Sequence, residues 1–268
     1  MPNLPTTIET ETGDAWTPKE SGKVEYTGEL KPLWWGLALS RNNYSSWIMK
    51  QAKQPVAVAD FIHKMGVTSY IDPVYALCLG TPDVSLYEMV GAYSTFANRG
   101  VHTTPMFVTR IEDRQGNIIS QFTPTTSDAI SEQTAYTMLG MLKNVVRSGT
   151  AGRLRWMFNF SGENMGGKTG TSQNSSDAWF IGVTPKLVAG SWVGGEDRSV
   201  HPHAGGEGAV MALPIFAKFM QQVYADPRLG VYETDPFPLS SGTVTFDCGN
   251  ASEIPPPNDP GTRDEFFN

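Results

Sequence analysis

Residues 167–194 read GKTGTSQNSSDAWFIGVTPKLVAGSWVG, and this stretch decides the fold. Its apolar residues change from helical spacing to a period of two, which predicts short strands at 167–172, 178–183 and 187–193. The loops between these strands are short, so neighbouring strands must run antiparallel. Trp179 and Ile181 point to one face of the middle strand and Phe180 to the other, which predicts helical layers on both faces of the sheet.

Helical periodicity lies on both sides of this segment. The clearest signal begins at Ser85, which can cap a helix, and ends before Gly100. Weaker patterns predict further helices, and a turn containing Gly116 separates two predicted strands. The predicted helices cover 47–53, 55–64, 131–146 and 209–224, and the predicted strand pair covers 107–111 and 118–122. The sequence therefore predicts an α+β protein in which helices flank an antiparallel sheet.

Charge and composition exclude several classes of protein. The 268 residues include 20 basic and 27 acidic side chains, and the net charge of −7 argues against a nucleic-acid-binding scaffold. The longest apolar run, Leu33 to Leu39, is far shorter than the roughly 20 residues that span a bilayer. Cys78 and Cys248 form neither a metal-binding cluster nor a disulfide framework, and His201 has only His203 nearby, so no metal site is expected.

Two polar stretches could carry chemistry. Lys168-Thr169-Gly170-Thr171 begins a strand, which places a cation and alternate hydroxyls along one edge, and its glycine lets a ligand approach the backbone. Ser40-Arg41-Asn42 falls in a turn between two helices. Taken alone, the first stretch fits a surface strand equally well, and the second is better explained as a helix-ending turn. Asp177 either orients the Lys168 strand or ends a loop, and the loop is the simpler interpretation.

The order and spacing of these stretches resemble the C-terminal part of the transpeptidase domain of class A, bifunctional penicillin-binding proteins. The likeness covers most of residues 1–225 and runs through 13–18, 39–42, 79–100, 138–150, 167–182 and 214–220. It implies the helix-sheet-helix fold of the serine β-lactamase superfamily. It also implies a serine acyl-transfer site built from three motifs, S-x-x-K, S-x-N and K-T-G.

The resemblance implies a role for each matching residue. Ser40 would relay a proton to the leaving amine, and Asn42 would hold the substrate amide or the lysine. Lys168 would supply positive charge beside this relay. The backbone N–H of Thr171 would serve as the strand donor of the oxyanion hole. The implied substrate-binding strand, whose hydroxyls would grip the terminal carboxylate of the donor peptide, comprises Thr169, Gly170 and Thr171.

The first motif is absent from this sequence, because no lysine has a serine three positions earlier. In the family the nucleophile and its lysine precede the stretch that matches residues 4–18 by some tens of residues. We therefore expect a C-terminal fragment of a longer protein, inert in acylation by itself. A partial transpeptidase domain would occupy residues 1–225, and a proline-rich, largely irregular tail would occupy 226–268. Without the missing helix, the Trp179 or the Phe180 side of the sheet would be left uncovered.

The resemblance also implies the parent reaction. A serine would attack the D-alanyl-D-alanine end of a peptidoglycan stem peptide and pass the acyl group to an amine of an acceptor strand, and β-lactams would trap the acyl-enzyme. No metal, organic cofactor or nucleic acid is implied. A missing upstream segment would hold the parent at the outer, periplasmic face of the cytoplasmic membrane. The alternatives are a D,D-carboxypeptidase or β-lactamase-like hydrolase and a non-catalytic binding module.

Overall fold

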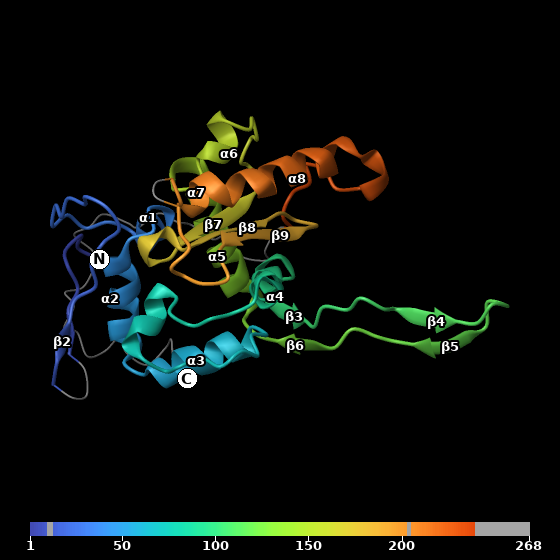
Figure 1. Ribbon diagram of the computed structural model, residues 1–268, viewed down its shortest axis with the longest axis horizontal. Helices are drawn as coiled ribbons and strands as arrows, with labels where there is room; N and C mark the ends of the chain where they lie inside the picture. Colours follow the sequence, from blue (N-terminus) through green and yellow to red (C-terminus); the bar gives the residue numbers. More distant parts are fainter. Residues whose placement is uncertain (10–12, 203–204, 239–268) are drawn as a thin grey trace.

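A computed structural model gives the structure of the chain and describes residues 1–9, 13–202 and 205–238 (Figure 1). A three-stranded sheet lies at its centre, with the strands β7 (Gly166–Thr171), β8 (Asp177–Val183) and β9 (Val188–Gly194). These strands run antiparallel in the order β7-β8-β9, so β7 is an edge strand and β8 lies in the middle. The predicted strands and their directions are confirmed.

One helical layer covers the face of the sheet to which Phe180 points. It consists of α7 (Gly208–Met211) and α8 (Leu213–Ala225). Phe180 is fully buried, and its ring centroid lies 4.9 Å from that of Phe216 on α8. The sequence predicts a single helix over 209–224, and that prediction is wrong in one respect. The helix breaks at Ala212, because Pro214 lacks an N–H for the preceding turn and its ring crowds that turn.

The second layer consists of α4 (Leu86–Ala97), which crosses the opposite face, and α5 (Glu132–Ser148), which runs beside β7 (Figure 1). Glycines make these close approaches feasible. A Cβ atom at Gly190 would press into Leu86 and Val90 of α4, and one at Gly166 would press into Leu142 of α5. The prediction of helical layers on both faces is therefore confirmed.

The first part of the chain adds a small hairpin and three helices beside the sheet. The helix predicted over 47–53 begins earlier, at Asn42. The carboxylate of Glu20 accepts hydrogen bonds from the backbone N–H groups of Asn42 and Asn43. These N–H groups lie in the first turn of the helix, where they have no partner within the helix. The elements of this part are β1 (Ile8–Glu9), β2 (Ala15–Trp16), α1 (Leu33–Ala38), α2 (Asn42–Ala52), α3 (Pro55–Lys64) and the 3₁₀ helix η1 (Tyr75–Leu79). Short helical turns elsewhere are α6 (Arg153–Trp156), η2 (Gln173–Ser175) and η3 (Pro227–Leu229).

A long two-stranded arm extends from the body between α4 and α5 (Figure 1). Its strand pairs are β3 (Val101–Thr103) with β6 (Thr126–Asp128) and β4 (Arg110–Glu112) with β5 (Ile118–Gln121). Asp113 accepts hydrogen bonds from the backbone of Gln115 and Asn117 at the tip, where Gly116 has a φ of +85°. The predicted strand-turn-strand unit is confirmed, although β4 begins three residues later than expected.

Residues 226–238 follow α8 and lie against the body. Lys186 forms an ion pair with Asp235 at 3.1 Å, and the backbone N–H of Ser161 donates to Glu233. The rest of the predicted irregular tail, 239–268, lies outside the described residues, as do Cys248 and His203. Among the helices that are described, none combines the length and the apolar character needed to cross a membrane.

The N-terminus of α4 is fixed by a buried carboxylate. Ser85 accepts a hydrogen bond from the backbone N–H of Glu88, and the two residues form a capping box. Backbone and hydroxyl groups of Thr68, Ser69 and Ser85 all donate to the Glu88 carboxylate, which is 9% exposed. Burial alone would raise the pKa of Glu88, but the bonds from Ser85 and Ser69 hold it far below its ordinary value.

Replacing Glu88 with Gln should lower the free energy of unfolding by about 2–3 kcal/mol, because an amide cannot accept from all of these donors. The carboxylate stabilises the fold fully at pH values above its ordinary pKa. This stabilisation is lost as the pH falls towards the depressed pKa of the folded state. The difference between wild type and Glu88→Gln should therefore shrink in acid. Urea unfolding at pH 7 and pH 3 measures this, with Glu132→Gln in the first turn of α5 as the control. Equal free energies of unfolding for Glu88→Gln and Glu132→Gln at pH 7 would refute the role of Glu88.

Candidate active site

The structure brings the two predicted polar stretches into direct contact. Lys168 Nζ donates hydrogen bonds to Ser40 Oγ and to the carbonyl oxygen of Thr169, both at 2.8 Å. Ser40 and Lys168 lie 128 positions apart in the sequence, so the fold alone makes them neighbours. They occupy the junction between the α1–α2 turn and the edge strand β7.

Ser40 is held in an uncommon backbone conformation. It follows the C-cap of α1 and has a φ of 55°, in the left-handed region where glycine is favoured. The N–H of Ser40 donates to the carbonyl of Leu37, and the N–H of Arg41 donates to that of Gly36. This pattern is a Schellman motif with serine where glycine is usual. The strain places a hydroxyl at the end of α1, beside Lys168.

Asn42 is the first residue of α2 rather than part of the preceding turn. Its side-chain amide donates to the carbonyl oxygen of Lys19 at 2.7 Å. That amide group is thus directed to the N-terminal segment. The role implied for Asn42, holding the lysine or the substrate amide, stays a prediction.

Lys168 extends from β7 into partly buried surroundings. Burial lowers the pKa of its amine to about 8, because the charged form loses hydration. A substantial fraction of the amine can therefore be neutral slightly above neutral pH. Such a group can both give and accept a proton, which suits acid–base chemistry at the Ser40 hydroxyl.

The two threonines of the predicted substrate strand have protein partners. The Thr169 hydroxyl lies 2.6 Å from that of Thr150, and Thr169 is 8% exposed. The Thr171 hydroxyl accepts a hydrogen bond from the backbone N–H of Gly208 at 3.0 Å. Because it accepts there, the exposed Thr171 hydroxyl still has its own proton to donate to a ligand. Gly170 lies between them, opposite Trp179 on β8. Their implied roles in binding a carboxylate stay predictions.

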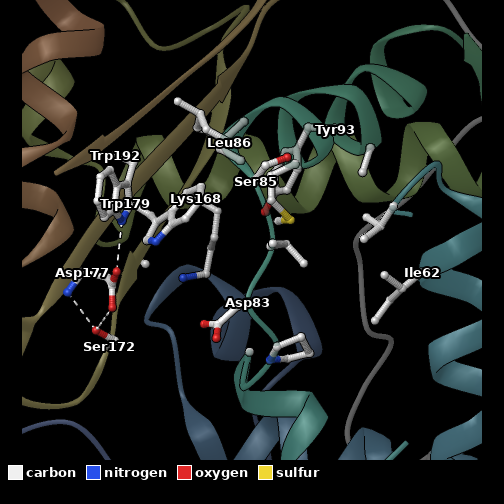
Figure 2. A pocket seen from close by; sticks show the side chains of 18 of the residues that line it. Ile62, Asp83, Ser85, Leu86, Tyr93, Lys168, Ser172, Asp177, Trp179 and Trp192 are labelled. Carbon is white, nitrogen blue, oxygen red and sulfur yellow. Dashed lines mark hydrogen bonds between the residues drawn. The ribbon is translucent and has the colours of Figure 1, made fainter. Parts of the chain in front are cut away.

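A groove of about 750 Å³ opens beside Lys168 (Figure 2). One wall is the Trp179 face of the sheet, including Ile181. The opposite wall consists mainly of apolar side chains from α3, α4 and η1, among them Ile62, Tyr93 and Phe96. The Phe180 side is covered by α8, and α4 covers part of the Trp179 side, so the groove opens on the part of the Trp179 side beside Lys168.

Asp177 fastens the end of β7 to β8. Its carboxylate accepts hydrogen bonds from the Ser172 hydroxyl and from Trp192 Nε1 (Figure 2). It also accepts one from the Ser176 hydroxyl. Burial raises the pKa of Asp177, but these bonds outweigh it and hold the pKa below its ordinary value. The sequence favours Asp177 as a simple loop end, and that interpretation is incomplete, because the side chain also anchors the strand that carries Lys168.

Sequence reasoning missed the contacts of Thr150 and Gly208, and it gave the orienting role of Asp177 only as the less favoured alternative. Thr150 and Gly208 act through single hydrogen bonds to β7 from segments 19 and 37 positions away. Threonine and glycine are common residue types, and no local pattern singles these two out. Two of the contacts that hold β7 thus become visible only in the folded chain.

Replacing Lys168 with Met should change how stability depends on pH. Between pH 8 and about 10.5, the unfolded chain keeps a proton on Lys168 that the folded chain has released. The wild-type protein should therefore gain stability across this window relative to Lys168→Met. Urea unfolding at pH 7.5 and pH 10 measures the difference, with Lys186→Met, at an exposed lysine, as the control. Parallel profiles for wild type and Lys168→Met would contradict a depressed pKa.

A family model described as the penicillin binding protein transpeptidase domain matches residues 70–221. The chain is 32% identical over 212 residues to penicillin-binding protein 1A of Aquifex aeolicus, covering 79% of this chain and 28% of that protein. It is 29% identical over 259 residues to penicillin-binding protein 1B of Vibrio cholerae, covering 95% of this chain and 33% of that protein. The chain thus spans about a third or less of the length of these relatives.

Two solved structures share the fold. Penicillin-binding protein 1A from Haemophilus influenzae matches with a TM-score of 0.76 at 23% identity, covering 90% of this chain and 40% of that one. The PonA1 protein from Mycobacterium tuberculosis, in complex with penicillin V, matches with a TM-score of 0.61 at 21% identity, covering 87% of this chain and 64% of that one. The described helices and the antiparallel sheet are therefore arranged as in these proteins.

Proposed function

The chain belongs to the transpeptidase family of class A penicillin-binding proteins, and from this premise we propose that it is the C-terminal part of a peptidoglycan D,D-transpeptidase domain. The observation that carries the proposal is the 2.8 Å hydrogen bond from Lys168 Nζ to Ser40 Oγ. A hydroxyl beside an amine of lowered pKa can pass a proton to a leaving group and take one back. This relay is what acyl transfer from a peptide requires.

The proton path follows from the geometry. When the donor peptide bond breaks, the departing D-alanine amine needs a proton. Ser40 Oγ donates its proton to that amine and receives one from the Lys168 ammonium, which is left neutral. The pKa of about 8 favours this transfer from the Lys168 ammonium to Ser40 Oγ near neutral pH. Attack by the acceptor amine runs the same path in reverse.

Donor recognition is proposed at the outer end of β7. The donor of this reaction class ends in a free carboxylate, which Lys168 attracts and to which the exposed Thr171 hydroxyl can donate. A β-lactam carries a carboxylate in a similar place, and a related structure holds penicillin V. The partners are therefore a D-alanyl-D-alanine stem peptide, an acceptor strand with a free amine, and β-lactams. No cofactor takes part in this chemistry.

The nucleophile is proposed to come from residues outside this sequence, which contains no Ser-x-x-Lys. A helix that carried this motif would need to reach the Ser40–Lys168 pair and cover apolar surface there. The groove offers that surface, because Trp179, Ile181 and Phe96 line it and Lys168 lies in its wall. We place the parent protein at the outer face of the cytoplasmic membrane, where peptidoglycan is cross-linked.

Fluorescent penicillin tests the proposal. A longer protein with a Ser-x-x-Lys segment ahead of residue 1 should be labelled covalently, and the 268-residue chain should not. In the longer protein, Ser40→Ala and Lys168→Ala should each slow labelling about a hundredfold or more, because each residue acts in the transition state.

The matched controls are Ser148→Ala and Lys186→Ala, which alter exposed residues at the end of α5 and in the β8–β9 turn. Both should label at wild-type rates. Labelling of the 268-residue chain would show that the nucleophile lies within it. Wild-type labelling of both site variants would remove Ser40 and Lys168 from the mechanism.

Product analysis separates the transpeptidase from its alternatives. The longer protein, given a peptide ending in D-alanyl-D-alanine and an excess of amine acceptor, should form the transferred amide. Free tetrapeptide alone would indicate a D,D-carboxypeptidase, and rapid release of penicilloate would indicate a β-lactamase-like hydrolase. If the longer protein formed no product and took up no label, it would be a non-catalytic binding module.

A further inference from the structure

The turn that follows α5 touches both halves of the Ser40–Lys168 pair. Thr150 lies in this turn, two residues after the end of α5. It contacts the C-terminal end of α1 through its backbone and β7 through its side chain. Ser40 follows α1 by two residues, and Lys168 lies on β7. A single residue thus connects the two segments that must meet.

The backbone contact fixes the end of α1. The N–H of Thr150 donates to the carbonyl oxygen of Ala38 at 3.0 Å, and Ala38 is the last residue of α1. The preceding residue allows this approach because it is glycine. A Cβ atom at Gly149 would collide with that same carbonyl oxygen. The turn therefore packs against the end of α1 with no room for a side chain at position 149.

The side-chain contact fixes β7 beside Lys168. The Thr150 and Thr169 hydroxyls lie 2.6 Å apart, and Thr169 is almost fully buried. The carbonyl of Thr169 in turn accepts the second hydrogen bond of Lys168 Nζ. The Thr150 hydroxyl therefore acts on the residue whose backbone carbonyl holds the lysine amine.

We propose that Thr150 is a positioning residue that sets the separation of Ser40 Oγ and Lys168 Nζ and keeps water from the lysine. This role rests on the proposed function, because it concerns the same proton relay. Ser40 has a strained backbone at the end of α1, and the Thr150 contact links that end directly to β7. A 2.8 Å contact between two segments so distant in sequence tolerates little drift.

The test is the titration of Lys168 by NMR in the 268-residue chain, with the resonance assigned by its loss in Lys168→Arg. Thr150→Val keeps the shape of the side chain but leaves the buried Thr169 hydroxyl without its partner, so water should enter to replace it. Hydration of the amine should raise the pKa of Lys168 from about 8 towards its ordinary value of 10.5. Thr150→Ser, which keeps the hydroxyl, should titrate as wild type.

A matched control and a second variant complete the design. Thr137→Val also removes a threonine hydroxyl from this part of the chain, but that hydroxyl donates to Gln133 within α5 and should leave the Lys168 titration unchanged. Thr169→Val removes the other half of the pair and should raise the pKa as Thr150→Val does. The double variant should raise the pKa of Lys168 little further than either single variant, because both substitutions break the same contact.

An unchanged Lys168 titration in Thr150→Val and Thr169→Val would overturn the proposal, and Thr169→Val decides alone if Thr150→Val does not fold. In the longer protein, Thr150→Val should slow penicillin labelling about tenfold and shift its pH profile to higher pH, and Thr150→Ser should restore both. Failure of the longer protein to label would refute the proposed function while leaving the titration result standing.

Discussion

The hydrogen bond between Lys168 and Ser40 is the contact on which the geometry of the candidate site depends. The partly buried amine of Lys168 loses hydration when it is charged, so its hydrogen-bond partners must compensate. On one side, β7 carries the lysine and is anchored by Asp177, Thr150 and Gly208. On the other side, α1 ends in a Schellman motif that presents Ser40. Both sides are fixed to the same sheet-and-helix body, which explains how two remote segments keep a separation of 2.8 Å.

The parts of the fold that the sequence predicts are those governed by local periodicity. The strands around Phe180 and the helix capped by Ser85 follow from alternation, helical spacing and a cap, all of which act between near neighbours. The errors arise where a distant or steric effect decides. Glu20 caps α2 and moves its start to Asn42, and Pro214 divides the last helix in two. Neither effect changes the apolar pattern from which helices are predicted.

The candidate site likewise contains residues that the sequence predicts and residues that it does not. Lys168 and Ser40 belong to recognisable motifs, and the structure places them in contact. The supporting residues Thr150 and Asp177 lie in stretches that resemble the family, but the resemblance implies no role for either of them. Thr150 matters because α5 ends against α1, and Asp177 matters because Trp192 arrives from the next strand. These contacts depend on the relative placement of whole elements, which the spacing of side chains along one element does not specify.

The left-handed conformation of Ser40 sets backbone stability against the contact with Lys168 at a single position. Glycine would relieve the backbone and complete the helix-ending motif, but it would remove the hydroxyl that Lys168 contacts. Selection of variants for thermal stability alone would therefore favour glycine at position 40, although such variants would lose the hydrogen bond between Ser40 and Lys168. The most stable variant at this position would therefore not be the one that keeps the geometry of the candidate site.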